Sequence, residues 1–130
     1  DLSRAMLTRA YEKNIYNTLH QTDISYHLAN AQLDFDYFVA ADVFVYMGDL
    51  SDVFRLVRSN NQRPGKLVFS TEHLEGKGFQ LRNTGRYAHS RHYVERLCDE
   101  HNYRLNYFST TNLRKDRGEV IVGGVYLLDF

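Results

Sequence analysis

The sequence predicts an α/β fold in which a mostly parallel sheet ends in an antiparallel hairpin. Apolar runs of strand length alternate with segments whose apolar residues recur at helical spacing. Residues 37–41 and 66–70 are two such runs, a pattern typical of strands covered on both faces in a parallel sheet. Residues 103–110 and 120–128 form the last two runs, and the charged turn between them favours an antiparallel hairpin.

Helices are expected where a capping residue precedes a stretch with helical spacing. Ser3 can cap a helix that runs to about residue 13. Asp49 or Ser51 can cap a second helix, and a third is expected over residues 92–101.

Three further segments complete the expected order of elements. A short strand at residues 20–22 ends at Asp23, and residues 24–31 form a loop or a short helix. Residues 71–90 are polar and contain three glycines, which predicts a long loop. Long loops in compact domains are usually functional or disordered.

Length and charge narrow the classes of protein that the chain can represent. Its 130 residues fit one domain, and its 16 basic and 16 acidic side chains balance. No bulk charge therefore attracts it to nucleic acid or to an anionic membrane. The longest apolar run, residues 38–47, has about half the length that spans a bilayer and contains Asp42, so no membrane span is expected.

The cysteine and histidine pattern predicts neither a disulfide nor a metal site. Cys98 is the only cysteine, which excludes an internal disulfide and suits a reducing compartment such as the cytoplasm. His89 and His92 have the spacing of a metal-binding pair, but no third ligand at matching spacing accompanies them.

Several stretches, in their order and spacing, resemble the class I S-adenosylmethionine-dependent methyltransferases. They are Asp1-Leu2-Ser3-x-x-Met6-Leu7, Thr22-Asp23-Ile24, Phe35-Asp36 through Ala41-Asp42-Val43-Phe44-Val45-Tyr46, and Arg63-Pro64-Gly65 before Lys66 to Ser70. Residues 85–90, which follow 69–72, are similar to the small-molecule methyltransferases that are fused to tetratricopeptide repeats. The resemblance covers nearly all of the chain and implies a Rossmann-like sheet whose last strand runs antiparallel.

The resemblance also implies that residues 1–130 are the C-terminal part of a single methyltransferase domain. The first strand, its glycine-rich loop and most of the second strand of the family pattern are missing. Those glycines let the backbone approach the methionine part of the cofactor, so we expect the chain alone to bind S-adenosylmethionine much more weakly than a complete enzyme. We also expect self-association through exposed sheet edges, or a rearranged segment 1–23.

The resemblance assigns the cofactor site to Asp1 and Leu2, Asp23 and Ile24, and Asp42 and Val43. Asp1 matches the acid that binds the ribose hydroxyls, with Leu2 beside the adenine. Asp23 matches the acid that accepts from the adenine amino group, and the N–H of Ile24 meets a ring nitrogen. Asp42 lines the methionine end of the cofactor or the substrate mouth. Each acid has a structural alternative, because Asp also caps helices and forms turns.

Candidate substrate-binding residues are Tyr46, Arg86, Tyr87 and His89, and candidate catalytic residues are Glu72, His73 and His89. An arginine favours a substrate with a carboxylate or phosphate, and a histidine or glutamate could accept a proton from an attacking oxygen or nitrogen. The alternative for each is a solvated loop residue.

The function implied by the resemblance is methyl transfer from S-adenosylmethionine to an oxygen, nitrogen or carbon of a small molecule. An alternative from another class is a non-catalytic remnant that acts as an association module through its unpaired sheet edges. A nucleotide-dependent oxidoreductase would also use an acid on a ribose, but the terminal hairpin disfavours it.

Overall fold

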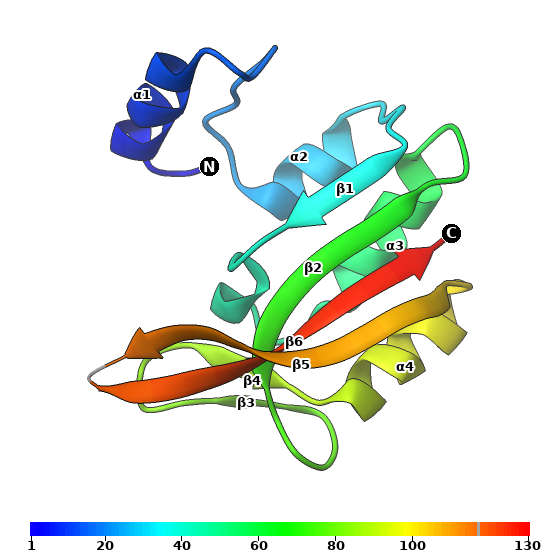
Figure 1. Ribbon diagram of the computed structural model, residues 1–130. Helices are drawn as coiled ribbons and strands as arrows, with labels where there is room; N and C mark the ends of the chain where they lie inside the picture. The colour runs from blue at the N-terminus through cyan, green and yellow to red at the C-terminus, as the bar shows by residue number, and fades with distance from the viewer. Residues whose placement is uncertain (117) are drawn as a thin grey trace.

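Helices and strands alternate through most of the chain, in agreement with the predicted α/β class (Figure 1). The computed structural model describes residues 1–116 and 118–130. The helices are α1 (Arg4–Lys13), α2 (Ile24–Asn30), α3 (Ser51–Asn60) and α4 (Arg91–His101), with a short 3-10 helix η1 (Phe44–Tyr46). The strands are β1 (Tyr37–Ala40), β2 (Lys66–His73), β3 (Phe79–Leu81), β4 (Tyr87–His89), β5 (Arg104–Asp116) and β6 (Glu119–Asp129).

The sheet is built around β2. One edge of β2 pairs antiparallel with β6, and the other edge pairs in parallel with β1 and, further along, with β4. β3 pairs with β4 and β5 pairs with β6, both antiparallel. The C-terminal hairpin is therefore confirmed.

The expectation of a mostly parallel sheet is wrong, because three of the five strand pairings among the described residues are antiparallel. The reason lies in the C-terminal hairpin, which brings two antiparallel pairings, β2 with β6 and β5 with β6, and in residues 20–22, which add no parallel strand. Residues 71–90, which were expected to form a loop, contribute one pairing of each kind. They extend β2 by three residues and then form the β3–β4 hairpin, whose turn is closed by hydrogen bonds between Arg82 and Arg86 and from Gly85 to Arg82. Gly85 takes a positive φ of 77°, which suits glycine in a tight turn.

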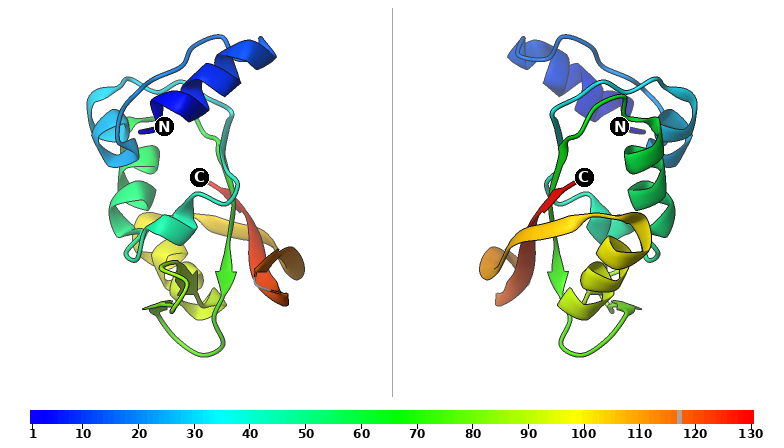
Figure 2. Two further views of the ribbon diagram at one scale, coloured as in Figure 1. Left: turned by 90° about the vertical axis from the view of Figure 1, so that its left-hand side faces the viewer. Right: turned by 90° about the vertical axis from the view of Figure 1, so that its right-hand side faces the viewer.

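Helices α2, α3 and α4 lie on one face of the sheet, and no helix among the described residues covers the other face (Figure 2). Alternate residues of β1 point to opposite faces. Phe38 and Ala40 therefore pack among the helices, whereas Tyr37 and Val39 are 60% and 71% exposed. The expectation that residues 37–41 are covered on both faces is wrong for this reason.

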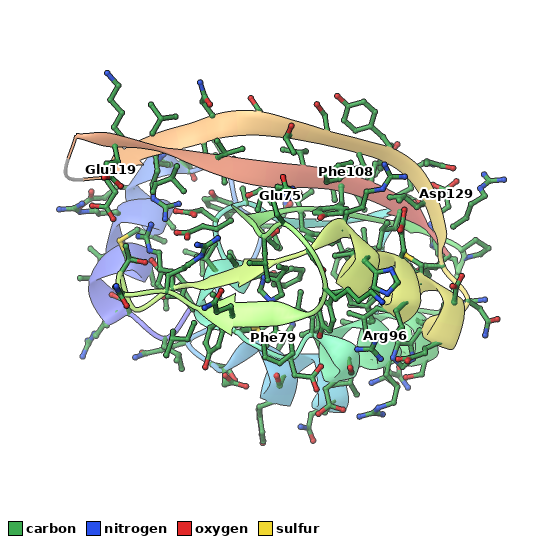
Figure 3. All side chains as sticks on the ribbon, turned by 90° about the horizontal axis from the view of Figure 1, so that it is seen from below. Glu75, Phe79, Arg96, Phe108, Glu119 and Asp129 are labelled. Atoms are coloured by element: carbon green, nitrogen blue, oxygen red, sulfur yellow. The ribbon has the colours of Figure 1, made fainter. Side chains whose placement is uncertain are left out.

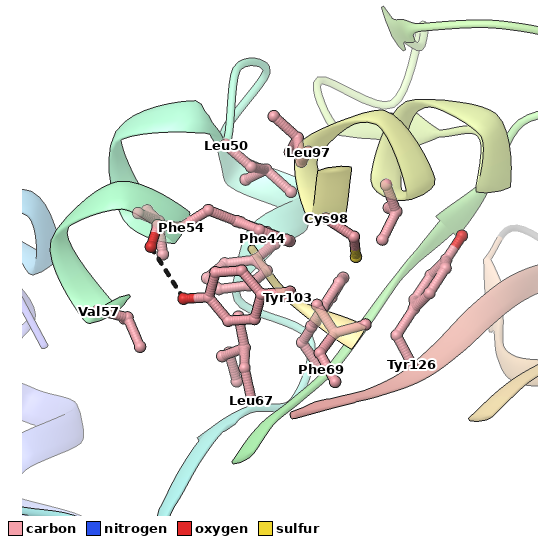
Figure 4. Close-up of a cluster of buried hydrophobic side chains, with 14 of the residues drawn as sticks. Phe44, Leu50, Phe54, Val57, Leu67, Phe69, Leu97, Cys98, Tyr103 and Tyr126 are labelled. Atoms are coloured by element: carbon pink, nitrogen blue, oxygen red, sulfur yellow. Dashed lines mark hydrogen bonds between the residues drawn. The ribbon is translucent and has the colours of Figure 1, made fainter. Parts of the chain in front are cut away.

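The core lies between these helices and strands β2 and β6 (Figure 4). The Phe69 ring stacks on Tyr126, with centroids 4.8 Å apart, and meets Phe54 edge-on. The Tyr103 hydroxyl donates to the Phe54 carbonyl at 2.8 Å, so the one polar end of this side chain is satisfied inside the core. Burial raises the pKa of the Cys98 thiol to about 12, which makes Cys98 a packing residue.

Side-chain caps fix the starts of three helices. Ser3 caps α1, Asp23 caps α2 and Ser90 caps α4, each by accepting a hydrogen bond from a backbone N–H three residues further along. At the start of α3, the Asp49 carboxylate accepts from both the N–H and the hydroxyl of Ser51, and these bonds lower the pKa of Asp49. The predicted role of Ser3 is confirmed. The prediction of Asp49 or Ser51 as the cap of the next helix is wrong, because Leu50 occupies the cap position of α3; Asp49, one residue earlier, stabilises the start of α3 through its bonds to Ser51.

The strand expected at residues 20–22 is absent. Residues 15–22 form neither helix nor strand, and the chain enters α2 directly at the Asp23 cap. A segment of this length keeps strand geometry only when a neighbouring strand pairs with it, and no described strand does so here. α1 lies beyond α2 and β1, and none of its residues is buried (Figure 1).

The C-terminal hairpin extends along one side of the molecule, with Glu119 near its tip and Asp129 at the opposite end (Figure 3). The Asp129 carboxylate accepts from Lys66 Nζ at 2.6 Å and from Arg104 Nη2 at 2.8 Å. These hydrogen bonds hold the pKa of Asp129 down to about 2. Within the described residues, no helix has the length and apolar character needed to cross a bilayer.

Candidate functional site

The candidate site lies where β1 and β2 end. The two strands pair in parallel, so their C-terminal ends meet at one edge of the sheet. Asp42 follows β1 by two residues, and Glu72 is the penultimate residue of β2. Ligands of open α/β sheets bind outside the C-terminal ends of parallel strands.

Asp42 is held at this edge through both its backbone and its side chain. Its φ of 55° is uncommon for a residue other than glycine, although Asp tolerates it better than most. Its N–H donates to Ser70 Oγ at 3.0 Å, and its carboxylate oxygen Oδ1 accepts from Arg114 Nη1 at 2.9 Å.

Arg114 also donates, through Nη2, to Oε1 of Glu72. We call Asp42, Glu72 and Arg114 the carboxylate–arginine cluster. Glu72 is only 5% exposed, and a buried carboxylate requires such a charged partner. The sequence predicted Asp42 and Glu72 but not Arg114, which it placed in the charged turn of the hairpin. Only the register of β5 on β6 brings Arg114 to the other two residues.

Tyr46 and Arg86 were both predicted to bind the substrate, and the structure brings them together. The Arg86 guanidinium carbon lies 5.5 Å from the centroid of the Tyr46 ring, and Nη2 donates to the Tyr46 hydroxyl at 3.2 Å. Both side chains reach solvent, and no ion pair of Arg86 is found among the described residues. The guanidinium therefore remains available to an anion.

Glu72 and His73 lie on opposite faces of the sheet, because successive residues of a strand alternate. His73 Nε2 lies 3.2 Å from Glu75 Oε1, and the His73 ring packs near Phe108 with centroids 5.9 Å apart. Of these two catalytic candidates, only Glu72 belongs to the carboxylate–arginine cluster.

His89 has no exposed surface, so the structure gives it a packing role rather than a place in the site. Its Nε2 lies 2.8 Å from the carbonyl oxygen of Gly48, which makes Nε2 the protonated nitrogen. Its Nδ1 is buried without a partner, and burial lowers the pKa of the ring. A substrate cannot touch His89 in this structure, and we remove it from both candidate sets.

Tyr87 and Val43, two further predicted site residues, lie at different places. The Tyr87 ring meets Phe79 edge-on at 6.1 Å and lies against Gly48, where an added Cβ would come within 2.9 Å of it. Val43 precedes η1 and is partly exposed next to Asp42.

The predicted nucleoside-binding residues Asp1, Leu2, Asp23 and Ile24 lie beside a separate cavity but do not line it. The main-chain nitrogen of Asp1 donates to the carbonyl of His20 at 3.0 Å, and the Gln21 side chain donates to the carbonyl of Leu2 at 3.3 Å. The N-terminal residues are thus fastened beside the segment that leads to Asp23. A cavity of about 290 Å³ opens here, lined by His20, Gln21, Thr22, Tyr26, His27, Asn30 and Ala31.

Several solved structures with this fold are S-adenosylmethionine-dependent methyltransferases. A putative enzyme of this kind from Listeria monocytogenes has a TM-score of 0.75 at 15% identity, over 99% of this chain and 77% of that one. One from Clostridium acetobutylicum has a TM-score of 0.71 at 16% identity, over 100% and 73% of the two chains. Magnesium protoporphyrin IX methyltransferase from Synechocystis, solved with bound S-adenosylmethionine, has a TM-score of 0.67 at 17% identity, over 99% and 56%.

These likenesses define the class of fold: it is that of the class I S-adenosylmethionine-dependent methyltransferases, as the sequence predicted. No family model and no curated protein matches the sequence. The chain corresponds to part of each of these three structures, between 56% and 77% of their lengths. The finer likeness to enzymes fused to tetratricopeptide repeats stays a prediction.

Proposed function

We propose that the chain contributes the nucleoside-binding and acceptor-binding parts of a methyltransferase that transfers a methyl group from S-adenosylmethionine to a small molecule. The observation that carries the proposal is the likeness to methyltransferases over 99 to 100% of this chain in the three structures compared. Residues at the ends of β1 and β2, where this class of fold binds ligands, support it.

The predicted residues beside the cavity between residues 20 and 31 fit the nucleoside half of S-adenosylmethionine. Asp1 and Asp23 each use one carboxylate oxygen in a local backbone hydrogen bond, and the other oxygen has no partner among the described residues. A carboxylate can accept from both ribose hydroxyls or from an adenine amino group. Leu2 is 68% exposed and offers an apolar surface to a base, as does the aromatic lining of the cavity.

Each predicted residue has a defined part in this proposal. Asp1 holds the ribose with Leu2 against the base, Asp23 and the N–H of Ile24 hold the adenine edge, and Asp42 with Val43 faces the methionine end or the acceptor. When bound, the cofactor supplies a methyl group on a sulfonium, which is itself the leaving group. The protein therefore has chiefly to align the acceptor with the methyl group and to exclude water.

Arg86 and Tyr46 are proposed to hold the acceptor. A guanidinium that stacks on an aromatic ring and keeps free N–H donors suits a carboxylate or phosphate on a small molecule. Tyr87, which follows Arg86 in the chain, is proposed to contact the acceptor as well. Of the two remaining catalytic candidates, Glu72 lies on the face of β2 that carries the carboxylate–arginine cluster, where Arg114 pairs with it, and His73 points to the other face.

Isothermal titration calorimetry with S-adenosylmethionine tests the nucleoside site. Asp23→Ala should weaken binding about tenfold, the loss of one hydrogen bond of about 1.4 kcal/mol. Asp52→Ala is the matched control, since Asp52 is an exposed acid that pairs with Arg55 on α3. Equal affinities for Asp23→Ala and the unmodified chain would reject the adenine role.

A second candidate function, an association module, is favoured by the outer edge of β1. This edge is unpaired among the described residues, and the exposed Tyr37 and Val39 lie beside it. Strand edges of this kind pair with another chain, and a charged residue on the edge prevents it.

Sedimentation velocity over a range of concentrations distinguishes this second candidate from the first. Association through β1 predicts a dimer that Val39→Lys converts to a monomer, whereas Val122→Lys on the exposed hairpin leaves it unchanged. A chain that stays monomeric at all concentrations, or a dimer that survives Val39→Lys, would remove the edge of β1 as the contact.

A further inference from the structure

Arg114 connects the C-terminal hairpin to the site across a long stretch of sequence. It lies 72 residues after Asp42 and 42 residues after Glu72, yet one guanidinium group donates to both carboxylates. The sheet order places β6 between the strand that carries Arg114 and the strand that carries Glu72. The Arg114 side chain must therefore reach across β6.

Two local features of the hairpin allow this reach. The register of β5 on β6 shifts between Asn112 and Arg114, and such a bulge redirects the side chains beside it. Opposite Glu72 on β6 stands Gly123, which has no side chain. A Cβ at this position would lie 2.0 Å from the Leu113 side chain and 2.7 Å from the Thr71 carbonyl oxygen. The glycine thus lets residues 113 and 114 lie close over β6.

The two carboxylates are held in different ways. Glu72 is buried in the sheet, so its ionised form needs the positive charge of Arg114. The same ion pair holds the Arg114 guanidinium in place. Asp42 is about half exposed and keeps its second oxygen, Oδ2, without a partner among the described residues. The N–H donors of the planar guanidinium stand at fixed angles to one another. Once Glu72 holds the Arg114 guanidinium in place, the direction of its second hydrogen bond sets the orientation of the Asp42 carboxylate.

We propose that Arg114 is a positioning residue: anchored by Glu72, it orients the carboxylate of Asp42 toward the ligand at the ends of β1 and β2. The ligand part of this inference rests on the proposed function. Because coupling between binding and conformation is reciprocal, a ligand that contacts Asp42 also stabilises the tip half of the hairpin.

A double-mutant cycle measured by calorimetry with S-adenosylhomocysteine tests the inference. Arg114→Met and Asp42→Asn should each weaken binding several-fold, and the double variant should bind no more weakly than the weaker of the two single variants. Arg104→Met is the matched control, because Arg104 lies on the same hairpin but pairs with Asp129 at its other end. It should leave the affinity unchanged. Arg114→Lys should recover only part of the loss, since an ammonium lacks the planar arrangement of N–H donors.

Effects of Arg114→Met and Asp42→Asn that multiply in the double variant would overturn the inference, as would an unchanged affinity for Arg114→Met. A second measurement needs no ligand: hydrogen exchange of the Asp42 amide, which donates to Ser70 Oγ. Arg114→Met should accelerate this exchange several-fold and Arg104→Met should not. If the unmodified chain fails to bind the nucleoside, the proposed function falls, while the exchange rate at Asp42 still decides the role of Arg114.

Discussion

His89 and Asp42 illustrate how burial separates residues that the sequence treats alike. Both are polar, and both were predicted to serve the site. The His89 ring is enclosed and bonded to the Gly48 carbonyl, whereas Asp42 stays half exposed at a sheet edge. Residue type and spacing predicted both residues as site candidates. Only the packing of Phe79, Tyr93 and Gly48 around the imidazole shows that His89 is a core residue.

The buried ring of His89 predicts a pH dependence of stability. Burial lowers its pKa from the ordinary 6.5, so the unfolded chain binds a proton that the folded chain resists. The stability is therefore fully present above pH 6.5 and is lost as the pH falls from there toward the lower pKa of the folded state.

Urea unfolding of the unmodified chain and of His89→Gln, compared between pH 7.5 and pH 5, measures this effect. The amide of Gln can still donate to Gly48, so His89→Gln should lose less stability on acidification than the unmodified chain. The other five histidines are common to both proteins and cancel in the difference. Parallel pH profiles would contradict a buried, neutral His89.

At the scale of the elements, the starts of helices are the features that local chemistry specifies best. Ser3 caps its helix as predicted, because a cap needs only a hydroxyl and a backbone N–H three residues further on. A strand at residues 20–22 would have needed a neighbouring strand to pair with it. Asp23 caps α2 instead, which is the structural alternative that the sequence analysis gave for this acid. β3 and β4 were missed because their three-residue strands lie among polar residues and glycines, without a clear alternation.

The hairpin depends on Gly123, where a side chain would meet Leu113 and the Thr71 carbonyl oxygen. Gly123→Ala should destabilise the fold by about 1 to 3 kcal/mol, because overpacking forces neighbouring atoms to move. Equilibrium unfolding measures the loss, with Val122→Ala on the exposed neighbouring position as the control. A Gly123→Ala variant as stable as this control would mean that the strands are not in such close contact.

At the scale of the whole molecule, the α/β class and the terminal hairpin could be predicted from the sequence, whereas the β3–β4 hairpin and the lack of a strand at residues 20–22 could not. The likeness to methyltransferase structures agrees with the predicted class of fold. Asp42 and Glu72 could be predicted from the sequence because each follows an apolar run, and Tyr46 and Arg86 could be predicted singly, from an apolar run and from the long polar segment. Their contact with each other could not. Arg114 could not be predicted either, since its place depends on the register of two long strands and on a bulge between them. Neither leaves a signal in a single sequence.

The central claim is that this chain binds the nucleoside of S-adenosylmethionine beside Asp1 and Asp23 and presents Asp42 to the rest of the ligand. Titration of S-adenosylhomocysteine into the isotopically labelled chain, followed by the shifts of its backbone amide resonances, tests it most directly, because it detects weak binding and locates it. The account predicts saturable shifts concentrated at Leu2, Ile24 and Val43 and at the lining of the cavity between residues 20 and 31. No shift at millimolar ligand, or shifts confined to the opposite end of the sheet around Asp129, would contradict it.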